Sequence, residues 1–242
     1  MKYFKTYESF KETGFLTDPA EIKAWLDSNL KNRRHYIIEK DGVVNVNGNV
    51  DLSGMKLKKI LVQFGKVDEY FWCSNNQLTN LKGAPEKVGG SFWCDHNQLT
   101  SLEGAPKKVD TNFFCDSNLL VNLKGVPKKI NGVFGCNNNR LTSLEGAPEE
   151  VGGDFCCNDN RLINLVGMPK VKGDVEFESN SGVPSEILKE VYELMKKNKT
   201  DWDMEIKKYI QTDPTVTKYL PKEELKRLGL DKENRLKSGG LI

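Results

Sequence analysis

Five of the six cysteines are spaced 21 residues apart, so any thiol chemistry in this chain would recur at regular intervals: Cys73, Cys94, Cys115, Cys136 and Cys157. Thiols could form disulfides or bind zinc. Zinc sites, however, typically have ligands in short loops such as C-x2-C, and the sequence has no such motif. A column of small apolar core residues is the simpler interpretation. We therefore predict that these thiols are buried, reduced and metal-free, which implies a reducing compartment.

Other residue types that perform catalysis are scarce. Neither of the two histidines, His35 and His96, has a partner at a recognised catalytic spacing, and His96 is interpreted as a polar turn residue. No phosphate-binding loop, nucleophile elbow or His-Glu metal motif occurs. The Asn/Asp-rich turns at 137–139 and 158–160 lack the bidentate glutamate of a calcium loop. We predict a protein that is not an enzyme and that uses no cofactor and no metal.

Aromatic residues recur with the same period and indicate recognition rather than catalysis. One outward-pointing column is expected to read Trp72, Trp93, Phe114, Gly135, Cys156 and Glu176. Its three large rings should lie side by side at steps of about 5 Å, and a contiguous exposed aromatic stripe is typical of a binding surface. An alternative stays open, in which the rings pack under the N- or C-terminal segment.

Polar residues flank this aromatic column. The next column reads Ser74, Asp95, Asp116, Asn137, Asn158 and Glu178, and arginines occupy the turns beside the later repeats. Aromatic anchors inside a polar rim resemble protein-binding hot spots. The candidate protein-binding residues are Trp72, Trp93, Phe114, Asp95, Asp116, His96, Arg140 and Arg161. Lysines gather on the opposite side, where a solvated face is the simpler interpretation than a phosphate track.

These residues belong to a repeated unit, F-x-C-x-x-N-x-L-x-x-L-x-G-x-P-x-x-V, with five copies in phase from Phe71 to about Asn180. Phe-x-Cys predicts a short strand with two side chains in the core. The Asn amide can bond the backbone groups that a turn leaves unpaired. Gly-x-Pro favours an extended or polyproline-like return. The repeat predicts a solenoid with a parallel sheet on one face and an irregular opposite face.

The unit resembles the leucine-rich repeat L-x-L-x-x-N-x-L, with Phe and Cys replacing the first two leucines. The variant Asn-x-Leu-Thr-Ser-Leu-Glu-Gly-Ala-Pro, at 97–106 and 139–148, is similar to the short helix-free repeats of bacterial effectors and to "LTSLEGAP" proteins of tailed bacteriophages. The resemblance covers roughly residues 18–180 and implies a leucine-rich-repeat solenoid with parallel β-strands on its concave face and an irregular convex face. Some such effectors carry a ubiquitin-ligase domain with a cysteine nucleophile, but residues 158–242 contain neither Cys nor His.

The segments before and after the repeats do not follow the 21-residue pattern. Residues 1–49 are expected to form an α/β cap, with Asp18 as the N-cap of a helix and strands near 36–38 and 43–46 covering the first coil. The solenoid should occupy residues 50–180, its first coil being degenerate. Within residues 181–242 we predict a helix at 185–197, with Ser185 as its cap, and two more helices at 202–210 and 221–228. This segment forms either a cap on the solenoid or a small separate module.

Composition narrows the functional classes. The net charge of +2 argues against a nucleic-acid binder, and no apolar run is long enough to cross a membrane. We expect a cytoplasmic protein, in the host cell if phage-encoded, that binds a host protein through its concave face and so counters host defence. A structural or assembly role in a virion is the alternative, and self-association is left open. The hypothesis that the helical tail has an enzymatic activity has the least support, because it contains few residues of catalytic type.

Overall fold

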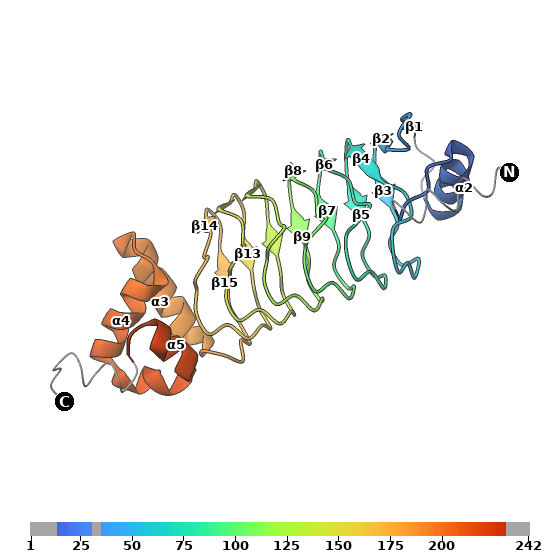
Figure 1. Ribbon diagram of the computed structural model, residues 1–242. Coiled ribbons are helices and arrows are strands. Elements are labelled where there is room, and N and C mark those ends of the chain that lie inside the picture. Colours follow the sequence, from blue (N-terminus) through green and yellow to red (C-terminus); the bar gives the residue numbers. More distant parts are fainter. Residues whose placement is uncertain (1–13, 31–34, 231–242) are drawn as a thin grey trace.

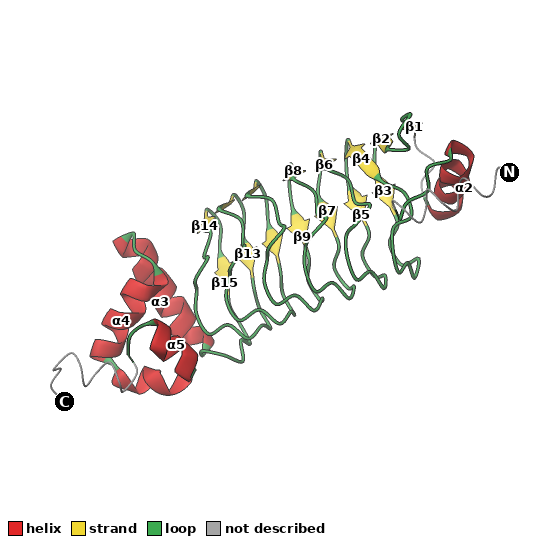
Figure 2. Ribbon diagram, in the orientation of Figure 1, coloured by secondary structure: helices red, strands yellow, loops and turns green. Residues whose placement is uncertain are grey.

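The computed structural model describes residues 14–30 and 35–230, and these form an elongated stack of coils with helices at both ends (Figure 1). Strands line up across successive coils and loops connect them (Figure 2). The architecture is therefore a parallel-sheet β-solenoid, as the 21-residue period predicts. Within these described ranges, no helix has the length and apolar character needed to cross a bilayer.

The main sheet has seven parallel strands, one from each coil. Equivalent residues pair, so that Phe71 lies opposite Phe92 and Trp72 opposite Trp93. Each strand has two residues, and the five strands that begin with Phe end before the cysteine that we expected to close them. The strands are β3 (Val50–Asp51), β5 (Phe71–Trp72), β7 (Phe92–Trp93), β9 (Phe113–Phe114), β11 (Phe134–Gly135), β13 (Phe155–Cys156) and β15 (Val175–Glu176).

The segment after each proline is not irregular, which corrects the sequence-based prediction. It contains a short strand, and these strands pair in parallel with their equivalents in neighbouring coils to form a second sheet, which is interrupted between Lys108–Val109 and Lys129–Ile130. Val88 is buried and Lys87 is exposed, so a two-residue alternation is enough to place one side chain in the core. Together with β4 (Phe64–Val67), its equivalent in the first coil, which follows no proline, these strands are β6 (Lys87–Val88), β8 (Lys108–Val109), β10 (Lys129–Ile130), β12 (Glu150–Val151) and β14 (Lys170–Val171).

The core is built from identical residues stacked coil upon coil. The Phe, Cys and two Leu side chains of the unit are fully buried in the central repeats. Neighbouring Phe rings contact each other, with centroids 5.6 Å apart between Phe71 and Phe92. Burying each such ring contributes roughly 2–3 kcal/mol, and the period repeats that contribution in every coil.

The asparagine of each repeat unit bonds backbone groups at the turn, as we predicted from the sequence. Asn118 is buried; its amide donates to the carbonyls of Cys94 at 3.0 Å and Cys115 at 3.1 Å, and its Oδ1 accepts from the Leu99 N–H at 3.0 Å. Equivalent asparagines repeat these bonds one coil earlier and later. The column of amides therefore ties each turn to the previous coil.

The N-terminal end is closed by α2 (Pro19–Asn29) and by a hairpin of β1 (His35–Ile38) and β2 (Val44–Asn47). Asp18 caps the helix, as predicted, by accepting from the N–H groups of Ala20 and Glu21. Strand β2 pairs in parallel with β4, which extends the second sheet to the end of the stack. The hairpin thus covers the first coil.

Four helical segments close the other end: α3 (Ser185–Asn198), α4 (Trp202–Thr212), the 3-10 helix η1 (Pro214–Tyr219) and α5 (Lys222–Arg227). Ser185 is not the N-cap that we expected. It is the first helical residue, and its buried hydroxyl donates to the Phe177 carbonyl at 2.6 Å. The Tyr192 ring meets the Phe177 ring edge-on at 5.9 Å. These helices share one hydrophobic core with the coils, so they act as a cap.

Candidate protein-binding face

The outward column of the seven-stranded sheet holds three large aromatic rings in one continuous stack. The centroids of Trp72 and Trp93 lie 5.0 Å apart with an interplanar angle of 27°, and those of Trp93 and Phe114 lie 5.9 Å apart at 20°. Parallel in-register pairing forces this arrangement, because it places equivalent side chains one strand apart. All three residues are half-buried, so each remains partly exposed.

A fourth ring, Tyr70, joins this stack and was missed from the sequence. Its centroid lies 5.4 Å from that of Trp72 and 5.6 Å from that of Trp93, and 39% of the residue is exposed. A side chain added at Gly90 would come within 2.5 Å of the Tyr70 ring, so the glycine makes room for it. In the described part of the chain, the ring contacts of the three column aromatics are with one another and with Tyr70, not with a terminal segment.

Gly135 ends the aromatic stack. A Cβ at this position would lie 2.8 Å from Phe114 Cδ1 and 2.8 Å from Asp116 Oδ2. The Phe114 ring and the Asp116 carboxylate therefore lean over the strand that lacks a side chain. Beyond it the same column continues with Cys156 and the exposed Glu176.

The polar column beside the rings mainly stabilises the stack. Asp116 accepts from the Asn137 N–H at 2.9 Å, Asn137 from the Asn158 N–H at 2.7 Å, and Asn158 from the Glu178 N–H at 2.6 Å. Burial raises the pKa of the half-buried Asp116, although its hydrogen bonds oppose that shift. These groups are thus held in place by hydrogen bonds, and the carboxylates among them, Asp116 and Glu178, contribute to the electrostatic potential of the face.

The remaining candidate residues lie at the turn edge of this face. His96 has φ 52°, the left-handed conformation shared by the equivalent turn residues, and its Nδ1 lies 2.9 Å from Asp95 Oδ2. It is therefore the turn residue that we predicted. Arg140 and Arg161 are both exposed beside later coils, so the structure does not bring them against the ring stack.

The face as a whole is acidic. Its outward positions are the three that alternate along each strand, from Asn49, Asp51 and Ser53 in the first coil to Asp174, Glu176 and Glu178 in the last. No Lys or Arg occupies any of these positions. They carry seven carboxylates: Asp51, Asp95, Asp116, Asp154, Asp174, Glu176 and Glu178. From the cap, Lys189 forms an ion pair with Glu178.

The lysines lie elsewhere and pair with acids of their own or a neighbouring coil. Lys107 contacts Glu86 and Lys128 contacts Glu149, each at 2.8 Å, while Lys108 lies 3.0 Å from Asp110. All six groups are exposed, so these pairs contribute little stability. They neutralise the lysine charge, which agrees with a solvated surface better than with a phosphate track.

The five periodic thiols are buried, as predicted, and each of the six cysteines is free. The Cys94 Sγ donates to the Phe114 carbonyl at 3.4 Å, and burial raises the pKa of this thiol well above its ordinary value. The half-buried Cys156 differs, because it lies on the outward column. Among the described residues, no group of three or more His, Cys, Asp or Glu side chains is arranged to hold a metal ion.

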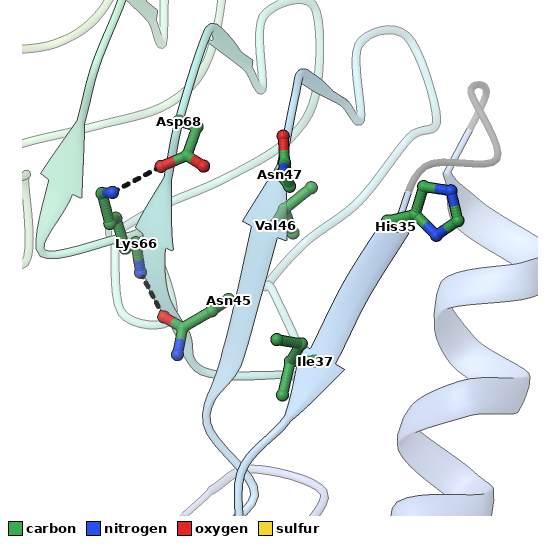
Figure 3. A pocket seen from close by; sticks show the side chains of 7 residues that line it. All are labelled: His35, Ile37, Asn45, Val46, Asn47, Lys66 and Asp68. Carbon is green, nitrogen blue, oxygen red and sulfur yellow. Dashed lines mark hydrogen bonds and ion pairs between the residues drawn. The ribbon is translucent and has the colours of Figure 1, made fainter.

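A shallow open pocket lies far from the ring stack, on the outer side of β1, β2 and β4 (Figure 3). Its lining includes His35, Ile37, Asn45, Lys66 and Asp68. The Lys66 Nζ lies 2.6 Å from Asp68 Oδ1, and Asn45 accepts from the Lys66 backbone N–H at 2.8 Å. Its charged groups are thus paired with each other, and the aromatic face remains the stronger candidate.

No protein-family model, no curated protein and no solved structure matches this chain.

Proposed function

We propose that this chain is a non-enzymatic protein-binding module whose partner docks on the aromatic and acidic face of the seven-stranded sheet. The observation that carries the proposal is the ring stack of Tyr70, Trp72, Trp93 and Phe114, which stays half-exposed on an outward face. Contiguous exposed apolar patches usually mark interaction sites, and aromatic anchors dominate protein-binding hot spots.

The biological setting of this proposal comes from the sequence resemblance alone. The repeat unit resembles leucine-rich repeats of tailed-bacteriophage proteins, so we propose the leucine-rich-repeat class for the solenoid and a protein of the bacterial host as partner. Binding would take place in the host cytoplasm and alter the activity of a defence protein. A role in the virion or its assembly is the competing proposal.

The test is affinity capture from a lysate of the bacterial host, with wild type, Trp93→Ala and Lys107→Ala compared. The proposal expects a stoichiometric host protein that Trp93→Ala loses and Lys107→Ala keeps, because Lys107 lies in an exposed ion pair off the face. Each variant's melting temperature shows that it is folded. Capture that is unchanged by a folded Trp93→Ala would move the site elsewhere, and detection of the chain in purified particles would favour the virion role.

A further inference from the structure

The central ring of the stack, Trp93, can present only its edge to a partner, and this restricts what the partner can be. The faces of Trp93 are occupied on one side by Trp72 and on the other by Phe114, at interplanar angles of 27° and 20°. A sugar or a nucleobase binds an aromatic residue by lying on its face. The central ring offers no free face, so a ligand cannot stack on the middle of this stripe.

The charge of the face restricts the partner further. The outward positions of the sheet carry carboxylates and no Lys or Arg, and the Asp154 and Asp174 side chains are exposed. Phosphate groups would be repelled by this potential, whereas Lys and Arg side chains would be attracted. A fitting partner therefore combines an apolar stripe with basic flanks.

The spacing of the rings selects the partner's secondary structure. The two centroid steps from Trp72 to Phe114 are 5.0 and 5.9 Å, so the outer rings lie at most 10.9 Å apart. Residues i and i+7 of an α-helix are about 10.5 Å apart along the axis, with i+3 or i+4 between them. Same-side residues of an extended strand rise about 6.7 Å per step, or about 13 Å over two steps, which loses register with the third ring.

We propose that the partner presents a basic amphipathic α-helix that lies along the stack axis, across β5, β7 and β9. This inference rests on the proposed protein-binding function and names the structural class of the partner. Apolar residues at i, i+3 or i+4, and i+7 contact the edges of successive rings. The absence of a side chain at Gly135 lets the helix continue toward the acidic coils, where its Lys or Arg residues approach Asp154.

Two synthetic peptides of identical composition test this proposal. Both contain about 15 Leu and Lys residues; one has leucine at helical spacing, and the other alternates Leu and Lys strictly. Fluorescence anisotropy of each labelled peptide would be measured against wild type, Trp93→Ala and Asp154→Asn. The matched control is Glu103→Gln, which removes an exposed charge away from the sheet face.

The proposal expects the helical peptide to bind wild type at least about tenfold more tightly than the alternating peptide. It further expects about tenfold or greater loss in Trp93→Ala, a smaller loss in Asp154→Asn and no change in Glu103→Gln. The proposal of a helical partner would be overturned if the alternating peptide bound as tightly as the helical peptide or more tightly. It would also be overturned if a folded Trp93→Ala variant bound the helical peptide as tightly as wild type does. If lysate capture depends on Trp93 while the peptides show no helical preference, the binding function stands and only this inference fails; if neither capture nor peptide binding depends on Trp93, both fail.

Discussion

Replacing Asn118 by alanine should cost far more stability than its small size suggests. Its amide group donates to the carbonyls of Cys94 and Cys115, and its oxygen accepts from the Leu99 N–H. Three neutral hydrogen bonds contribute about 3 kcal/mol at roughly 1 kcal/mol each. The buried Leu99 N–H is also left without an acceptor, and its desolvation adds about 1–2 kcal/mol. We expect a total loss of about 4–5 kcal/mol.

The matched control is Asn122→Ala in the same coil. The Asn122 side chain makes one exposed bond, accepting from the Lys124 N–H at 3.0 Å, so its loss should cost less than about 1 kcal/mol. Urea unfolding followed by circular dichroism would compare the two variants with wild type, on the condition that the slopes agree. Equal free energies of unfolding for the two variants would refute the idea that the amide column holds successive coils together.

Three further outcomes follow from the same geometry. Trp93→Ala should weaken partner binding by about 2 kcal/mol or more, whereas Lys107→Ala should change affinity little, both measured by calorimetry on variants whose melting temperatures are checked. Cys156 should be the first thiol to react with iodoacetamide in peptide mapping, and earlier labelling of a core thiol would contradict this. Burial and Glu176 raise its pKa to about 12, so the rate should keep rising about tenfold per pH unit above about pH 9, where the rate of an ordinary thiol levels off. Gly125→Ala should destabilise by more than about 2 kcal/mol, because φ is 105° and a Cβ would lie 2.4 Å from the Leu102 carbonyl oxygen; Gly54→Ala, with nothing within 4 Å, should cost less in the same thermal denaturation assay.

The main sheet could be predicted because its signal is repeated. A single Phe-x-Cys segment is ambiguous, but five in phase leave one register in which all phenylalanines are buried, and the structure has that register. The roughly 5 Å steps between Trp72, Trp93 and Phe114 follow from it. The role of the asparagines was also predictable, since a side-chain amide offers two donor hydrogens and a separate acceptor oxygen.

Features without a period were missed. Tyr70 has no aromatic counterpart at the equivalent positions Ser91 and Asn112, so the repeat pattern did not indicate an aromatic column at this position. The strands after each proline were missed because two residues such as Lys87 and Val88 are too few to separate a strand from an irregular extended segment. Ser185 was misplaced because its hydroxyl meets the Phe177 carbonyl of the last coil, a tertiary contact that overrides a local capping preference.

The in-register pairing of equivalent residues has a consequence for how such a chain can change over generations. Inward positions are occupied by the same residue in neighbouring coils, while the outward position varies from Trp72 to Gly135 to Glu176. A duplication or deletion of one 21-residue unit would therefore join equivalent junctions and leave every buried contact type in place. Selection could lengthen, shorten or rewrite the recognition surface one coil at a time without redesigning the fold beneath it.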